Sequence, residues 1–67
     1  MGGTVTNSCG VELHFSVATM LMDDDLREEL HRNTVPCTYQ EFFDKYAKAH
    51  GEKFGKPWVC DEFNGEI

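Results

Sequence analysis

The sequence lacks a hydrophobic run long enough to cross a membrane, and it has few positive charges. Its most apolar run, Val17–Met22, is far shorter than the roughly 20 residues of a transmembrane helix, and the N-terminus lacks the basic and apolar regions of a secretory signal. Twelve acidic side chains oppose six basic ones, which gives a formal net charge of -6. Nucleic acids and anionic membranes bind cationic patches, so the composition argues against direct binding to either. We therefore expect a cytoplasmic protein.

Cysteine pairs at the spacing of disulfide frameworks or zinc sites are also missing. Cys9, Cys37 and Cys60 are odd in number and far apart, which argues against a self-contained disulfide framework and favours reduced thiols. The three histidines add candidate ligands, but no C-x2-C or H-x3-H pair is present, so we expect no metal and no cofactor. A calcium loop starting at Asp23 would need glycine where Glu28 stands.

The chain has little catalytic equipment. A chain of 67 residues buries only about 60% of its unfolded surface, which leaves little room for a catalytic pocket. The best nucleophile is Cys37, which precedes a predicted helix start and has His31 or His50 as a candidate base. The favoured interpretation is structural, with Cys37 packing at that helix start and His50 at the rim of the core. We expect no enzyme and no catalytic residue.

The hydrophobic spacing predicts a small single domain over residues 1–67 that is mainly α, with α+β as the alternative. About three helices are expected, at residues 16–22, 23–33 and 38–53. Short extended segments or a hairpin are expected at the termini. Residues 1–3 are glycine-rich, and we expect them to be disordered.

The N-terminal part of the chain predicts a hairpin and the start of the first helix. Thr4–Thr6 and Val11–Phe15 are β-branched or alternating runs on either side of a turn, so they are candidates for paired strands. Ser16 is the candidate N-cap of the first helix, and Phe15 and Met20 are its candidate hydrophobic staple.

A helix break is predicted between the first two helices. At 100° per residue, Val17, Met20 and Leu21 share one arc, whereas Leu26 and Leu30 fall on the opposite side. One straight helix would therefore not bury both groups. The break is expected near residues 22–23.

The third helix has the clearest start signal. Thr38 and Glu41 have the spacing of a capping box, with Cys37 and Phe42 as the hydrophobic staple. Opposite charges four residues apart, such as Glu41 and Lys45, indicate a solvated face stabilised by ion pairs. The apolar arc of this helix is expected to form the centre of the core, with Phe42, Phe43 and Tyr46 as its main residues.

The end of the third helix and the tail are less strongly specified. Either Gly51 or Gly55 is expected to end the helix. The segment that follows, Lys56–Phe63, is predicted to be an extended tail that folds back over the helices or pairs with the N-terminal segment.

Dense negative charge is the sharpest surface feature of the sequence. Helix capping explains part of it, since acids stabilise the first turn of a helix. The same negative charge also offers carboxylates to the arginines and lysines of a groove that normally holds nucleic acid. The candidate partner-binding residues are Asp23, Asp24, Asp25, Glu28, Glu29, Asp61 and Glu62.

An alternative use of the surface is open. In that alternative the charge only keeps the protein soluble, and an apolar patch around Trp58 and Phe63 docks into a complex or mediates self-association. This would make the protein a structural or regulatory interaction module, and a homo-oligomer is one form of this alternative.

The segments Met22–His31 and Pro36–Phe43 resemble a pattern in small uncharacterised proteins of bacteriophages and integrative elements. They contain helix starts and amphipathic faces, so no catalytic residue is carried over. The size and acidity are similar to those of anti-CRISPR and other counter-defence proteins, several of which imitate the charge of nucleic acid. This resemblance implies a DNA-mimicking inhibitor whose partner is a basic nucleic-acid-binding protein, such as a CRISPR effector in a bacterial host.

Overall fold

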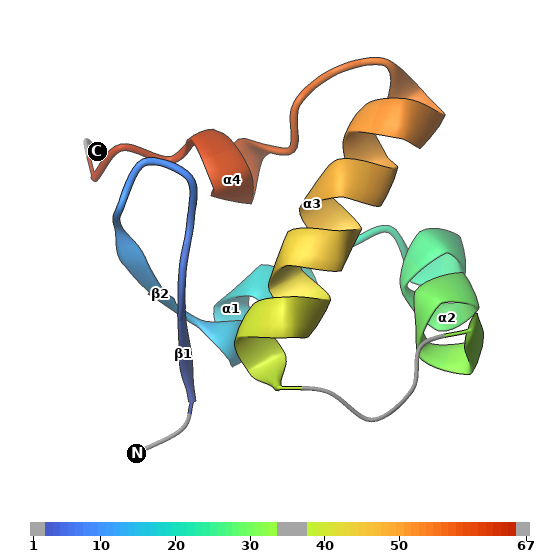
Figure 1. Cartoon of the computed structure of the whole chain (residues 1–67), viewed down its shortest axis with the longest axis horizontal. Coiled ribbons are helices and arrows are strands. Elements are labelled where there is room, and N and C mark those ends of the chain that lie inside the picture. The colour runs from blue at the N-terminus through green and yellow to red at the C-terminus, as the bar shows by residue number, and fades with distance from the viewer. Residues whose placement is uncertain (1–2, 34–37, 66–67) are drawn as a thin grey trace.

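A short hairpin opens the chain. The computed structural model describes residues 3–33 and 38–65 (Figure 1). β1 (Thr4–Thr6) and β2 (Glu12–His14) pair antiparallel, with Val5 opposite Leu13. The predicted hairpin is therefore confirmed. Gly3, which we expected to be disordered, continues the pairing because its carbonyl accepts the Phe15 N–H at 2.7 Å; Met1 and Gly2 lie outside the described residues.

The first two helices are separate, as the apolar arcs predicted. α1 (Phe15–Met20) and α2 (Asp24–Asn33) are joined by a turn at Leu21–Asp23. The predicted cap of α1 is wrong. His14 occupies the N-cap position without a side-chain hydrogen bond, so the helix begins one residue before Ser16. No staple forms either, because Met20 is 82% exposed.

The capping box of the third helix is confirmed. α3 (Tyr39–Phe54) begins after Thr38, whose hydroxyl accepts the Glu41 N–H while the Glu41 carboxylate accepts the Thr38 N–H. The hydrogen bonds that the Glu41 carboxylate accepts from the Thr38 N–H and hydroxyl lower its pKa. The helix ends at Gly55, which adopts φ 72°, a left-handed conformation that favours glycine. The Cys37 half of the predicted staple lies outside the described residues.

The charged face of α3 differs from the prediction. The Glu41 carboxylate bonds with Thr38, and the Asp44 carboxylate accepts a hydrogen bond from Gln40 at 3.0 Å. Across residues 3–33 and 38–65, none of the predicted pairs four residues apart forms an ion pair. Nearby hydrogen-bond donors bind the Glu41 and Asp44 carboxylates, and this face is solvated without direct ion pairs among the described residues.

The tail is partly helical, which corrects the prediction of an extended segment. α4 (Val59–Glu62) follows Trp58, and the segment folds back against the hairpin and α3 (Figure 1). The Asn7 side chain donates to the carbonyls of Cys60 and Phe63 at 2.9 and 2.7 Å. Side-chain hydrogen bonds, and not a third strand, thus join the hairpin to the tail.

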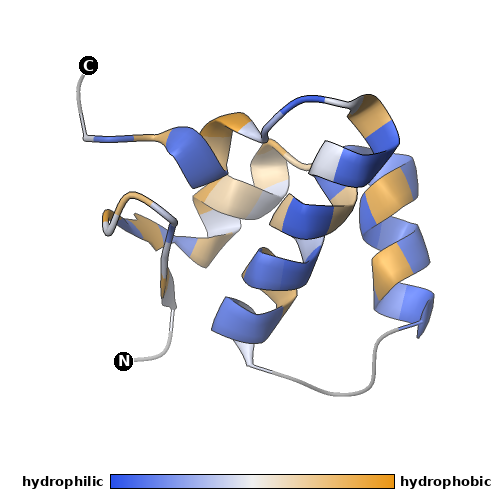
Figure 2. Ribbon diagram, turned by 45° about the horizontal axis from the view of Figure 1, so that its top comes forward, coloured by the Kyte–Doolittle hydropathy of each residue, from blue (hydrophilic) through white to orange (hydrophobic). Residues whose placement is uncertain are grey.

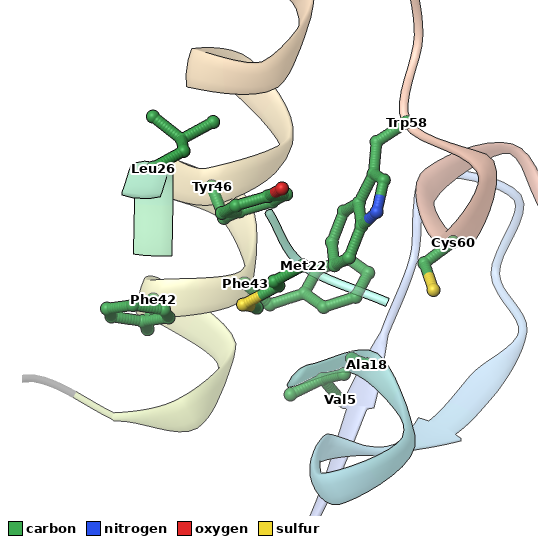
Figure 3. Packing of buried hydrophobic residues seen from close by; sticks show 9 residues of the cluster. All are labelled: Val5, Ala18, Met22, Leu26, Phe42, Phe43, Tyr46, Trp58 and Cys60. Carbon is green, nitrogen blue, oxygen red and sulfur yellow. The ribbon is translucent and has the colours of Figure 1, made fainter. Parts of the chain in front are cut away.

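The core lies where α3 meets the other elements, and it confirms the predicted centre. Tyr46 and Phe43 are fully buried, and the Trp58 ring packs against both at centroid distances of 4.4 and 5.1 Å. Burying each such side chain contributes about 1.5–3 kcal/mol to folding. The core residues shown in Figure 3 are Val5, Ala18, Met22, Leu26, Phe42, Phe43, Tyr46, Trp58 and Cys60.

Candidate partner-binding surface

The acidic cluster predicted at residues 23–29 lies on α2 and on the turn before it. All five of its carboxylate residues are exposed, whereas Leu26 on the opposite side of the helix is buried. The helix stands at the edge of the molecule, across α3 from the hairpin (Figure 1), and its ribbon is mostly hydrophilic (Figure 2). The cluster therefore faces solvent on an outer surface. Its members are Asp23, Asp24, Asp25, Glu28 and Glu29.

Asp23 has a structural role in this cluster. Its carboxylate accepts the Leu26 N–H at 3.1 Å, which is the hydrogen bond of a helix N-cap. Its own N–H donates to the Tyr46 hydroxyl at 2.7 Å, and this bond fixes the start of α2 to the centre of α3. Burial is the main cause of the raised pKa of Tyr46, whereas the hydrogen bond from the Asp23 N–H lowers this pKa. Asp23 is thus partly engaged in holding the fold.

The remaining carboxylates of the cluster are freer. Asp24 forms an exposed ion pair with Arg27 at 3.6 Å. In the part of the chain that the structure describes, the carboxylates of Asp25, Glu28 and Glu29 make no hydrogen bond or ion pair. These three groups are exposed and fully available to a partner.

The second predicted acidic group does not join the first. Asp61 and Glu62 lie on α4, which is on the hairpin side of α3, whereas α2 is on the other side (Figures 1 and 2). The Asp61 carboxylate accepts hydrogen bonds from the Ser8 hydroxyl at 2.7 Å and the Ser8 N–H at 3.2 Å. Glu62 is exposed. The structure therefore places the predicted contact residues in two groups and not in one continuous patch.

The predicted apolar patch around Trp58 and Phe63 is wrong. Trp58 is only 2% exposed, because its ring completes the core between α3 and α4 (Figure 3). Phe63 is half-buried, and its carbonyl is held by Asn7. The sequence did not distinguish a tail that folds back into the core from one that presents its aromatic residue to solvent.

A different apolar surface is exposed on α1. Val17, Met20 and Leu21 are 50, 82 and 55% exposed, and their spacing places them on one side of this segment. We call these three residues the α1 face. The sequence placed these residues on one arc, but it did not reveal that this arc faces solvent. The segment is buried instead through Ala18 and Met22.

The thiols and histidines are engaged in packing or exposed singly. Cys60 is buried, which raises the pKa of its thiol, and Cys9 is exposed. His50 is half-buried against the rings of Tyr46 and Phe54, as the prediction of a rim histidine requires. Among the described residues, no three histidine, cysteine or acidic side chains converge as metal ligands would. Cys37 lies outside those residues.

No helix in the described segments has the length and hydrophobicity to span a membrane. The fold and its surface instead define a small, mainly helical protein that displays an acidic helix on one side.

The family of the chain follows from its sequence. Residues 6–58 match the family model described as anti-CRISPR protein AcrIC5. The chain therefore belongs to the AcrIC5 family of anti-CRISPR proteins, which are inhibitors of CRISPR–Cas systems. The match includes α2 and its acidic cluster, and it ends before Asp61 and Glu62. Neither the curated proteins nor the solved structures contain a significant match to this chain.

Proposed function

We propose that this protein inhibits a CRISPR–Cas effector without enzymatic activity, by placing α2 in the groove where the effector holds nucleic acid. Membership of the AcrIC5 family supports a CRISPR–Cas protein as the partner. In this proposal the partner surface is basic, the protein acts in the cytoplasm of a bacterial host, and its gene comes from a phage or mobile element. The inhibitor itself contacts neither DNA nor a membrane.

The observation that carries the proposal is the row of exposed carboxylates on α2. An α-helix rises 1.5 Å per residue, so the four acids in the six residues from Asp24 to Glu29 supply about one negative charge per 2.3 Å of axis. Double-stranded DNA has one charge per about 1.7 Å. Arg27 offsets part of this density. Arginine forms bidentate pairs with carboxylates as well as with phosphates, so the acids of this helix can occupy arginines that otherwise hold DNA.

The two acidic groups have unequal roles in this proposal. Asp25, Glu28 and Glu29 lack intramolecular partners among the described residues, so they can pair with the effector without breaking any bond of the fold. Asp61 would have to release Ser8. We therefore assign the main contact to α2, with Asp61 and Glu62 in a supporting role.

The test compares two variants of equal net charge. One replaces the free acids of α2 (Asp25→Asn, Glu28→Gln and Glu29→Gln), and the matched control replaces three acids on β2 and α3 (Glu12→Gln, Asp44→Asn and Glu52→Gln). Each changes the formal net charge from -6 to -3 by removing three negative charges. The readout is displacement of fluorescent target DNA from a panel of purified, guide-loaded CRISPR–Cas effectors, measured from low to high salt.

We expect the unmodified protein to displace DNA from at least one effector, more strongly at low salt. The α2 variant should lose at least about tenfold in affinity, equivalent to about 1.4 kcal/mol, while the control stays within a few-fold. Equal losses in both variants would indicate an effect of net charge alone. Inhibition of cleavage without any displacement of DNA would contradict the groove-filling mechanism.

A further inference from the structure

The α1 face is the most exposed apolar surface of the described chain. Met20 is the most exposed large hydrophobic residue, and Val17 and Leu21 are at least half exposed. The segment Phe15–Met22 contains no charged side chain, although charged residues make up 27% of the sequence. A contiguous apolar surface without charge is typical of an interaction site, whereas isolated apolar residues on a surface are common.

The fold does not depend on these three side chains. The same segment anchors itself through Ala18, which is 0% exposed, and through Met22, which is 5% exposed. Phe15 stacks on Tyr39 at a centroid distance of 4.4 Å and fixes the start of α1. Apolar side chains that face water outside the core contribute little to folding, so their presence points to a use outside the fold.

Acidic residues adjoin the Leu21 end of the α1 face. Asp23 and the rest of the α2 cluster follow Leu21 after one residue, Met22. The Trp58 indole donates to the Leu21 carbonyl at 3.4 Å, which brings the start of α4 beside the same end of α1. Val59, which is 63% exposed, and the acids of α4 follow Trp58, but the Asp61 carboxylate binds Ser8 of the hairpin turn. The α2 acids are therefore the ones that adjoin the apolar face.

From this arrangement we infer that the α1 face docks onto an apolar spot of the effector that is flanked by the lysines and arginines of its nucleic-acid groove. The inference rests on the proposed function, and it adds a contact that DNA itself cannot make. Charge complementarity selects this occupant. A basic rim on the partner pairs with the α2 acids beside the Leu21 end of the face, while the apolar contact excludes water.

The same charges disfavour the other occupants. A second copy would bring two molecules of net charge -6 together with acidic rims opposed. Anionic lipid would be repelled for the same reason. Met20 suits a protein surface, since its flexible thioether adapts to irregular apolar pockets.

The test uses substitutions that keep size and remove hydrophobicity. Val17→Thr and Met20→Gln are combined in one variant, and Phe54→Gln, a residue 41% exposed at the far end of α3, is the matched control. Binding to the guide-loaded effector is measured at low and high salt by calorimetry. Thermal unfolding checks that both variants fold, and sedimentation measures the mass of the free protein.

We expect the α1 variant to lose at least about tenfold in affinity at every salt concentration, with an unchanged salt slope, and the control to bind like the unmodified protein. Unchanged affinity of the α1 variant overturns this inference, even when loss of binding by the α2 variant upholds the proposed function. Loss of binding by the α1 variant alone, with the α2 acids dispensable, rejects charge mimicry and also overturns the inference, because no basic rim would then flank the apolar contact. A dimer that the α1 substitutions dissociate, without weakening effector binding, overturns the inference in favour of a second copy.

Discussion

At the scale of the residue, Asn7 connects the two ends of the chain. Its Oδ1 accepts the N–H groups of Cys9 and Val11, both at 2.9 Å, which shapes the hairpin turn. Its amide nitrogen donates to the carbonyls of Cys60 and Phe63 in the tail. The side chain is 6% exposed, and it is the only buried polar residue of the described segments. One amide therefore satisfies four backbone groups that would otherwise lose partners.

Replacing Asn7 with alanine should lower the free energy of unfolding by about 2–3 kcal/mol, because buried backbone groups lose their hydrogen bonds. Urea unfolding measures this change. Asn33→Ala, which truncates an exposed asparagine on α2, is the control and should change stability by less than about 0.5 kcal/mol. Equal effects of the two substitutions would show that the Asn7 bonds do not hold the tail.

At the scale of the element, the start of α3 depends on a local exchange of hydrogen bonds. The Thr38 hydroxyl and the Glu41 backbone form one half of the box, and the Glu41 carboxylate with the Thr38 N–H forms the other. Hydrogen bonds from Thr38 are the main cause of the lowered pKa of Glu41. Both partners belong to one turn, and the pair can therefore be recognised in the sequence.

Thr38→Ala should cost about 1 kcal/mol of stability through loss of the cap.

Glu41→Gln keeps a residue that completes the capping box but removes the carboxyl group that titrates. Since the folded pKa of Glu41 is lowered, its stabilising effect is present above its unfolded pKa of about 4.3 and disappears as pH falls below it. The stability difference between the unmodified protein and Glu41→Gln should therefore shrink from pH 6 to pH 3 in urea unfolding. A constant difference would contradict this account.

The separation of interacting residues along the sequence explains which elements were predictable. The capping box, the break between α1 and α2 and the apolar side of α3 depend on residues close in sequence, and all three were predicted. The start of α4 and the burial of Trp58 depend on contacts with Leu21, Tyr46 and Asn7, which are distant in sequence. The acids of the candidate site were recognisable by composition, but their division between α2 and α4 required the fold.

At the scale of the whole molecule, part of the negative charge lies at positions where it lowers the stability of the fold. Glu28 and Glu29 lie beyond the first turn of α2, where the helix dipole no longer stabilises acids. Each also stands four residues after another acid, Asp24 or Asp25, and such like-charge pairs destabilise a helix by about 0.2–0.5 kcal/mol each. Among the candidate contact residues, the acids that serve the fold are instead Asp23 and Asp61, whose carboxylates bind the Leu26 N–H and Ser8. A partner is the simplest reason to keep the others.

If that reasoning holds, stability and binding should change in opposite directions. The double variant Glu28→Gln and Glu29→Gln should leave the free protein equally stable or about 0.4–1 kcal/mol more stable at low salt, because two like-charge pairs are relieved. Added salt should reduce this gain by screening the repulsion. The same variant should bind the guide-loaded effector more weakly. Urea unfolding at two salt concentrations, with Asp23→Ala as the capping control that should lose about 1 kcal/mol, measures the first effect. A clear loss of stability in the double variant would assign these acids to the fold and remove the argument that they are kept for a partner.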